Sequence, residues 1–217
     1  MAFAGRKAFA SRRRSRRIHP LRAAAFGSLA IGLFLIITFV SGLWQGFAAQ
    51  QSLDREWLGE VAARPVPPAA VDPGLQHPVN GIDFAIRVPR LGYFAAVREG
   101  VDRAHLYSGP GHYPTTVWPG SLGVVGVAAH NVYWINFPQL QRGDEIDLET
   151  RYGVYRYRVT GTRIVNPDDR TVLVPDINGY RLTLTTCWPL WAGAFATQRY
   201  VIFAIQVSPA SVLPAFA

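Results

Sequence analysis

The sequence contains a single cysteine, Cys187, among its 217 residues. No intramolecular disulfide can form, so the disulfide framework of many small secreted domains is excluded, and cysteine pairing does not indicate the compartment. The first 22 residues contain no acid but eight arginines and lysines, and the other 195 are balanced at 14 basic and 14 acidic residues. Because this positive charge lies in a tail rather than on a folded face, the sequence does not predict a nucleic-acid-binding protein.

Charged residues are also absent from Ala23 to Leu53, and residues 23–47 are almost entirely apolar. About 20 apolar residues suffice for a helix to cross a bilayer, so this stretch is predicted to be a transmembrane anchor. The basic residues directly before it predict that residues 1–22 form a cytoplasmic tail and that the remainder lies outside the cell. A cleaved signal peptide is the alternative, but its apolar region is shorter, about 7–15 residues.

Residues 48–80 are predicted to be a stalk followed by a proline-rich spacer, because the prolines between Arg64 and Pro78 are incompatible with a helix or an inner strand. The folded domain is predicted to occupy residues 81–217. It lacks any helical periodicity that lasts three turns. Short runs of β-branched and aromatic residues between Gly, Pro, Asn and Asp instead indicate an all-β fold.

Eight candidate strands suit a closed or nearly closed barrel, which also removes exposed sheet edges. The candidate strands are residues 83–88, 94–97, 124–129, 145–150, 154–164, 171–174, 180–186 and 199–207. One N-terminal transmembrane helix would precede this barrel.

The thiol of Cys187 directly follows a candidate strand, which must stop there because Pro189 cannot donate to a ladder. A thiol at a strand end is accessible to a substrate, although a free cysteine is also often a small buried hydrophobe. A nucleophilic cysteine needs a base or a cationic partner, since only a few per cent of a free thiol is ionised at neutral pH.

His130 has the best position of the five histidines, because it follows the apolar run Val124–Ala129 and would emerge at a strand end, as Cys187 does. The alternative is a solvated loop histidine. Arg199 opens the last long strand, and its planar, permanently charged guanidinium suits a developing oxyanion. Its alternative is a surface charge at a strand edge.

Several segments together resemble the sortases, the membrane-anchored cysteine transpeptidases of bacterial cell surfaces. Thr183–Cys187 reads T-L-T-T-C and is similar to the family's nucleophile strand, and Arg199 falls at the spacing of its arginine. The segment Phe137–Ile146 is similar to F-x-x-L-x-x-G-D-x-I, and Gly109–Pro114 reads G-P-G-H-Y-P, as in class D and class E sortases. His130 occupies the position of the family's catalytic histidine.

The resemblance implies an eight-stranded barrel that cleaves an LPxTG-type C-terminal sorting signal on secreted surface proteins. Cys187 would form a thioester, His130 would transfer protons, and Arg199 would hold the substrate and the oxyanion. The protein would then pass to an amine acceptor, a cell-wall precursor or a pilin lysine. The enzyme would be a single-pass protein of the cell membrane with its catalytic domain outside.

Three neighbours of the thiol, Thr185, Thr186 and Trp188, are candidate substrate-binding residues, although β propensity or core packing explains them equally well. No cofactor is expected. Calcium, which some sortases bind, would need the acidic residues 144–149, but their alternation after a Gly-Asp turn more simply indicates a solvated strand face. The alternative function is a catalytically silent, anchored barrel that binds envelope proteins or peptides.

Overall fold

The computed structural model describes residues 20–62, 71–174 and 178–208. Residues 1–19 of the predicted basic tail and residues 64–70 of the proline-rich spacer lie outside these residues. The chain divides into two compact units, residues 1–42 and residues 43–217.

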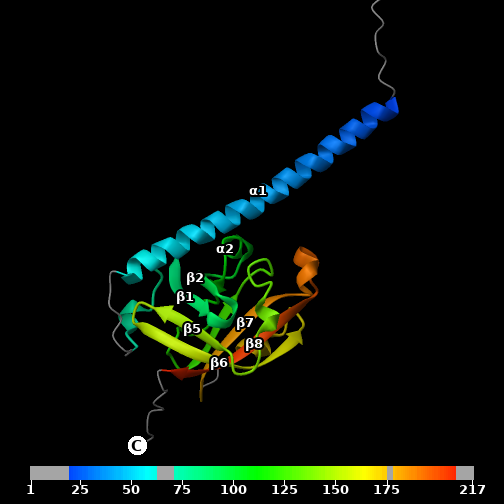
Figure 1. Cartoon of the computed structure of the whole chain (residues 1–217). Coiled ribbons are helices and arrows are strands. Elements are labelled where there is room, and N and C mark those ends of the chain that lie inside the picture. Colours follow the sequence, from blue (N-terminus) through cyan, green and yellow to red (C-terminus); the bar gives the residue numbers. More distant parts are fainter. Residues whose placement is uncertain (1–19, 63–70, 175–177, 209–217) are drawn as a thin grey trace, which may run out of the picture. The chain divides into compact units, whose positions relative to one another are not determined.

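Eight strands form one closed barrel in the order β1-β2-β3-β4-β7-β8-β6-β5, which confirms the predicted all-β, eight-stranded barrel (Figure 1). The strands are β1 (Ile82–Val88), β2 (Tyr93–Glu99), β3 (Gly111–His112), β4 (Gly123–Ala128), β5 (Glu145–Thr150), β6 (Gly153–Val165), β7 (Tyr180–Trp188) and β8 (Gln198–Ser208). Neighbouring strands are antiparallel except for the β2–β3 and β4–β7 pairs, which are parallel. The parallel β4–β7 pair matters for function, because it brings two strand ends to the same edge of the barrel.

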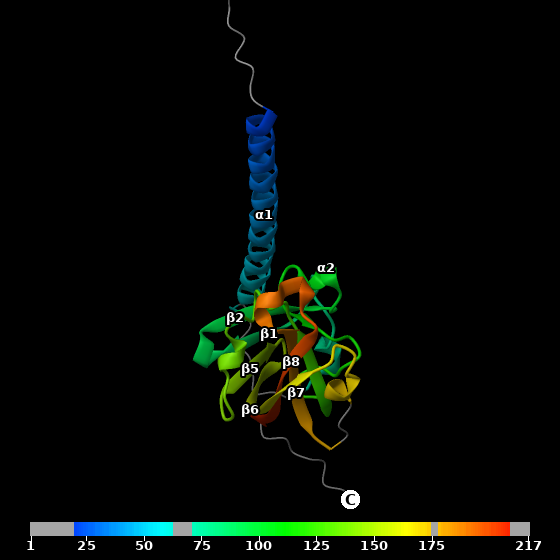
Figure 2. The same cartoon turned by 90° about the vertical axis from the view of Figure 1, so that its right-hand side faces the viewer.

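Helices occupy the connections between the strands. The helices are α1 (Pro20–Ala62) and α2 (Arg103–Leu106), and the short 3-10 helices are η1 (Pro73–Leu75), η2 (Pro89–Leu91), η3 (Phe137–Gln139), η4 (Arg170–Leu173) and η5 (Leu190–Phe195). Helix α2 and the η5 segment, orange in Figure 2, lie at the same end of the barrel.

One predicted strand, residues 171–174, is wrong, because this segment forms η4 instead. The Asp169 side chain accepts a hydrogen bond from the Thr171 backbone N–H at 2.9 Å and so caps the helix. A local cap of this kind competes with strand pairing despite the β-branched composition. The eighth strand of the barrel is β3, two residues that lie between Pro110 and Pro114 and are too short to show a strand pattern in the sequence.

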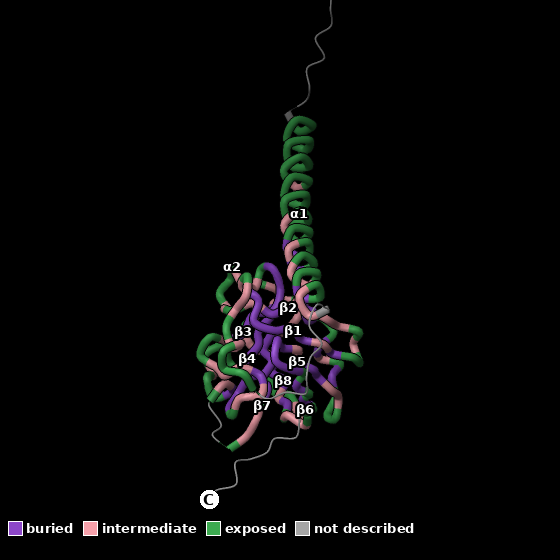
Figure 3. Tube along the Cα trace, turned by 90° about the vertical axis from the view of Figure 1, so that its left-hand side faces the viewer, coloured by how far each residue is buried: buried purple, intermediate pink, exposed green. Residues whose placement is uncertain are grey.

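The barrel interior holds one large apolar cluster. Figure 3 shows in purple how the buried residues gather along the barrel strands. Its largest fully buried side chains include Phe84, Trp134, Tyr155 and Tyr157. Alternation places the other residues of each strand on the outer face. On β7, Leu182 and Leu184 point into this core, so Thr183, Thr185 and Cys187 belong to the outer face.

Helix α1 changes character along its length. Within residues 21–42 almost every side chain is exposed. The helix, over Leu21–Val61, is the one helix of the described chain that is long and apolar enough to cross a membrane. Beyond residue 43 the helix packs against the barrel, and Trp57 is fully buried in its core. The compact unit thus begins at residue 43, earlier than the domain start predicted at residue 81.

Polar contacts fix the same helix segment to the barrel. The Arg151 guanidinium is buried and donates to both carboxylate oxygens of Glu60, at 2.8 and 3.1 Å. It also lies over the Trp57 ring, 5.0 Å from the centroid. Farther along the helix, the Asp54 carboxylate accepts from the Ala96 backbone N–H at 2.7 Å. The helical part of the predicted stalk, residues 48–62, therefore packs on the barrel.

Candidate active site

The parallel pairing of β4 with β7 carries His130 toward Cys187. Ala128 is paired with Thr185, and the Ala129 N–H donates to the Thr185 carbonyl at 3.2 Å. The Thr186 hydroxyl then donates to the Ala129 carbonyl at 2.9 Å, which holds the chain one residue beyond the end of β4. His130 follows directly after Ala129, at the edge of the barrel where β7 reaches Cys187.

The antiparallel pairing of β7 with β8 adds the guanidinium. Cys187 and Arg199 are directly paired positions, and such partners project from the same face of a sheet. Arg199 donates through Nη1 to the backbone carbonyl of Gln198 at 3.0 Å. Cys187, His130 and Arg199 are each half-buried, so all three lie at the outer face with partial access to solvent.

The imidazole of His130 sits in a positive field. Burial lowers its pKa below 6.5, and the positive charges of Arg103 and Arg199 lower it further. The effect of Arg199 agrees with the strand register, because both place the guanidinium near the imidazole. Among the described residues the thiol, the imidazole and the guanidinium form no direct hydrogen bond with one another, and such bonds are often long before a substrate binds.

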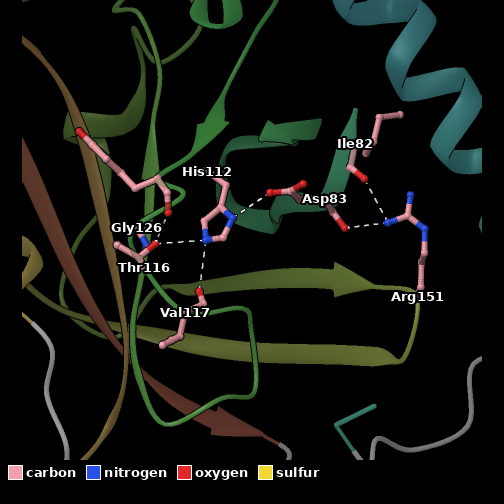
Figure 4. Close-up of polar contacts among 8 residues, drawn as sticks. Ile82, Asp83, His112, Thr116, Val117, Gly126 and Arg151 are labelled. Carbon is pink, nitrogen blue, oxygen red and sulfur yellow. Dashed lines mark hydrogen bonds and ion pairs between the residues drawn. The ribbon is translucent and has the colours of Figure 1, made fainter. Parts of the chain in front are cut away.

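The other described histidines of the barrel have different surroundings. His112 is buried, and its Nδ1 lies 2.8 Å from the Asp83 carboxylate (Figure 4). His105 lies near the surface with Nδ1 at 2.6 Å from Asp102. Neither imidazole is at the end of β4, so of these three histidines only His130 follows the strand that is paired with β7.

The buried His112 is a structural centre. Its Nε2 faces the Val117 carbonyl at 3.2 Å and the Thr116 hydroxyl at 3.1 Å (Figure 4). The Thr116 hydroxyl donates its hydrogen to the Tyr113 carbonyl at 2.8 Å and accepts from a β4 backbone N–H. Toward the imidazole it can therefore only accept a hydrogen bond. The Nε2 nitrogen therefore carries a hydrogen, and Nδ1 shares a buried hydrogen bond with the Asp83 carboxyl group.

The three candidate substrate-binding residues lie on two faces of β7. Thr185 shares the outer face with Cys187, and its hydroxyl lies 2.9 Å from the hydroxyl of Tyr113. Thr186 is on the opposite face, where its hydroxyl holds the Ala129 carbonyl. Trp188 is also on that face, with its ring 5.4 Å from the ring of Tyr200. Of the three, only Thr185 shares the face of the thiol.

A second, smaller apolar cluster lies on the outer face along β7 and β8. Val201 is paired with Thr185 on that face, and Val165, Val172, Leu173 and Phe203 pack around it. Helix η4 is fixed there because the Thr183 hydroxyl donates to the Val172 carbonyl at 3.0 Å. An apolar surface next to a thiol can accept the side chains of an extended peptide.

The acidic residues considered for calcium are bound by arginines. Asp144 pairs with Arg90, Asp147 with Arg156, and Glu149 with Arg87. No group of three or more acidic, histidine or cysteine side chains that could hold a metal ion occurs within the described parts of the chain. These carboxylates serve an ion-pair ladder, and the absence of a cofactor stays a prediction.

Some residues near the site were not expected from the sequence. Arg103 lies in the α2 connection, far from His130 in sequence, yet its charge acts on that imidazole. The Asn131 amide donates to the Leu190 carbonyl and so joins the loop after His130 to the loop after Cys187. The G-P-G-H-Y-P segment was a signal for Tyr113, but its side chain could be placed only once the pairing of β3 was known.

The Sortase domain model matches residues 86–207, more than half of the chain. The chain belongs to the sortase family. Members of this family are cysteine transpeptidases in general, which agrees with a half-buried thiol beside an imidazole and a guanidinium. The match covers β7 and β8 and hence both Cys187 and Arg199.

Individual sortases resemble the chain as well. Sortase D of Bacillus subtilis (strain 168) is 28% identical over 124 residues, which cover 57% of this chain and 63% of that protein, less than two thirds of its length. The structure of sortase E from Streptomyces avermitilis has 29% identity and a TM-score of 0.53, and covers 61% of this chain and 91% of that one. A Clostridium perfringens sortase D5 transpeptidase has 21% identity and a TM-score of 0.59 over 74% of this chain and 99% of that one, which supports the fold alone. The predicted resemblance to class D and class E sortases is confirmed.

Proposed function

We propose that this sortase cleaves an LPxTG-type C-terminal sorting signal after its threonine and transfers the protein to an amine. The strand register of β4, β7 and β8 supports the proposal most directly. The end of β4, which His130 follows by two residues, is paired with β7, and Cys187 on β7 is paired with Arg199 on β8. In the proposed reaction Cys187 is the nucleophile, His130 the proton carrier and Arg199 a fixed cation.

In the first step the Cys187 thiolate attacks the carbonyl carbon of the threonine, and a carbon–sulfur bond forms. Negative charge moves to the carbonyl oxygen, where the Arg199 guanidinium stabilises it. The carbon–nitrogen bond then breaks, and the His130 imidazolium donates its proton to the leaving amine. A thioester on Cys187 and a neutral His130 remain.

In the second step an amine acceptor attacks the thioester carbon. Neutral His130 takes the proton that the amine loses, a new amide bond forms, and Cys187 leaves as thiolate. The enzyme returns to its starting state without a cofactor. The acceptor would be a cell-wall precursor or a pilin lysine. If water attacks instead, the same thioester is hydrolysed.

The N-terminal helix suits a substrate that is itself held at the membrane. Its apolar part is long enough to serve as an anchor, and the preceding basic residues predict a cytoplasmic N-terminus. An anchored enzyme and an anchored sorting signal share one surface, which raises the effective concentration of each for the other. The catalytic unit would lie outside the cell.

The test uses the full chain and a sorting-signal peptide with a fluorescent group on one side of the motif. Wild type is expected to form a thioester that hydroxylamine releases, and Cys187→Ala to form none. His130→Ala and Arg199→Ala are expected to lose turnover while their circular dichroism stays unchanged. His77→Ala and Arg142→Ala, at exposed positions away from the site, are matched controls that should retain activity.

The outcomes separate the alternative functions. Peptide cleavage by Cys187→Ala at the wild-type rate, or no thioester on wild type, would refute the proposal and favour a silent binding barrel. Addition of an amine acceptor then distinguishes transfer from hydrolysis, because only transfer gives a product that contains the acceptor.

A further inference from the structure

The loops that follow His130 and Cys187 both lack charge and expose apolar side chains. Residues 131–141 and residues 188–198 contain no Asp, Glu, Lys or Arg. We name the exposed apolar residues of these loops the apolar rim. It consists of Val132, Ile135, Trp191 and Phe195, which are 38%, 55%, 87% and 88% exposed.

Such exposure is unusual for aromatic side chains on a folded barrel. Trp191 and Phe195 lie on η5, only four and eight positions after the thiol, and neither belongs to an apolar cluster of the described residues. Burial of such a side chain is favourable, so two aromatic rings in contact with water leave a favourable interaction unused. An exposed apolar surface free of charge indicates a partner.

Contacts within the barrel unit join the two loops and connect them to α1. The Asn131 amide donates to the Leu190 carbonyl, so the loop after His130 is bound to η5. Two residues later, the Tyr133 hydroxyl donates to the Tyr107 carbonyl at 2.6 Å. The Tyr133 ring also packs edge-on against Phe47 of α1, with centroids 5.3 Å apart.

The position of Phe47 identifies the partner. It lies five positions after Gly42, the last residue of the unit that holds the apolar, exposed part of α1. Even a fully extended chain covers at most about 18 Å over five residues. If that part of α1 spans the membrane, as the proposed function requires, the loop that carries Tyr133 and the rim lies close to the outer surface of the bilayer.

We propose that the apolar rim inserts into the outer interface of the lipid bilayer, next to the mouth of the active site. Tryptophan and phenylalanine are favoured at this depth, where an apolar ring leaves water without reaching the centre of the membrane. The absence of charge in both loops fits the same environment, because a charged side chain there would have to be desolvated. The inserted rim holds the thiol at the level where a membrane-held sorting signal emerges.

The test places a fluorescent probe on the rim of the full chain in phosphatidylcholine–phosphatidylglycerol vesicles. In a Cys187→Ala background, a new cysteine is introduced as Trp191→Cys or Phe195→Cys and is labelled with the environment-sensitive fluorophore NBD. The matched control is Val154→Cys, because Val154 is an exposed apolar residue near the start of β6, at the opposite end of that strand from the active site. Lipids with a doxyl quencher near the headgroup report contact with the interface.

Quenching at positions 191 and 195 is expected to exceed quenching at position 154 several-fold. Equal quenching at all three positions would overturn the proposal. Blue-shifted emission without doxyl quenching would also overturn it, because a second copy or the apolar part of a substrate would then cover the rim. If the chain does not float with vesicles, both the membrane anchor and the membrane insertion of the rim are refuted.

The proposed function is tested separately, through the thioester of the unlabelled wild type. A chain that floats with vesicles and forms the thioester, but shows no excess quenching at position 191, overturns the rim alone. If the rim is quenched but wild type forms no thioester, the proposal of rim insertion is supported and the proposed transpeptidase function is refuted.

Discussion

Replacement of Trp57 by alanine tests whether the segment after the apolar helix is part of the barrel. Trp57 is fully buried, although the sequence places it in a predicted stalk. Its indole lies in the main core cluster and under the Arg151 guanidinium, which is itself paired with Glu60. Trp57→Ala removes the largest side chain that α1 contributes to the core.

The expected loss is large compared with the stability of a domain. Truncation of a buried tryptophan to alanine costs about 3–5 kcal/mol, against a total free energy of unfolding of about 5–15 kcal/mol. For a domain of about 150–250 residues, 1 kcal/mol corresponds to about 2–4 °C in Tm. Trp57→Ala is therefore expected to lower the Tm of the barrel by about 6–20 °C.

Thermal unfolding of the full chain in detergent, followed by circular dichroism in the β-sheet region, measures this change. Leu58→Ala is the matched control, because Leu58 is the next residue of the same helix but is 46% exposed. Its Tm should stay within about 2 °C of wild type, as is usual for a surface substitution. A Trp57→Ala variant that melts with the control would refute the assignment of this helix segment to the core.

Three further predictions concern the surroundings of the site. Arg103→Gln removes a repelling charge and should raise the pKa of His130, so the acid limb of the pH–rate profile should move to higher pH. His112→Leu should cost about 1–3 kcal/mol in a urea titration, since it leaves the buried Asp83 carboxyl group without its hydrogen-bond partner. Tyr113→Phe, which loses one hydrogen bond on the outer face, should cost about 1 kcal/mol by the same measurement.

Contrary results would be equally informative. An unchanged acid limb in Arg103→Gln would show that its guanidinium does not act on the catalytic imidazole. A His112→Leu variant as stable as wild type would contradict a stabilising role for the buried contact between His112 and Asp83. A Tyr113→Phe variant with wild-type stability would mean that water replaces the lost contact.

Strand positions were predictable wherever alternation and turn residues coincide. The strand at residues 145–150 has the predicted bounds, because Arg142-Gly143-Asp144 marks its start and Tyr152-Gly153 follows its end. The prediction of a strand at residues 171–174 is wrong because a single hydrogen bond to the side chain of Asp169 caps a helix there. Residue periodicity does not record such a cap.

The burial of the α1 segment had a signal in the sequence that composition alone concealed. Leu53, Trp57 and Val61 recur at every fourth position between charged residues, which places them along one stripe of a helix. All three pack in or against the barrel core. The stripe indicates a buried helix face, but which surface it would meet depends on the closed barrel and could not be read from the sequence.

The candidate site was predictable in part from strand ends. Cys187 and Arg199 were singled out because each lies where a strand ends or begins, and the antiparallel register pairs them directly. Alternation from Cys187 also separates Thr185 from Thr186 and Trp188 before any coordinates are known. The influence of Arg103 was not predictable, because it depends on how the α2 connection folds over the barrel.

In the proposed mechanism His130 must be protonated and must then give up its proton to the leaving amine. A low pKa makes the protonated form rarer but makes it a stronger acid. Burial and two arginines disfavour the imidazolium, so each unit by which the pKa falls makes the thiolate–imidazolium pair tenfold rarer relative to the neutral pair. The same fall makes the imidazolium a stronger acid toward the leaving amine. Arg199 must stay close to stabilise the oxyanion, whereas Arg103 has no such role in the proposed steps. A substitution of Arg103 can therefore change both the population and the acid strength of the His130 imidazolium while the proposed catalytic residues stay in place.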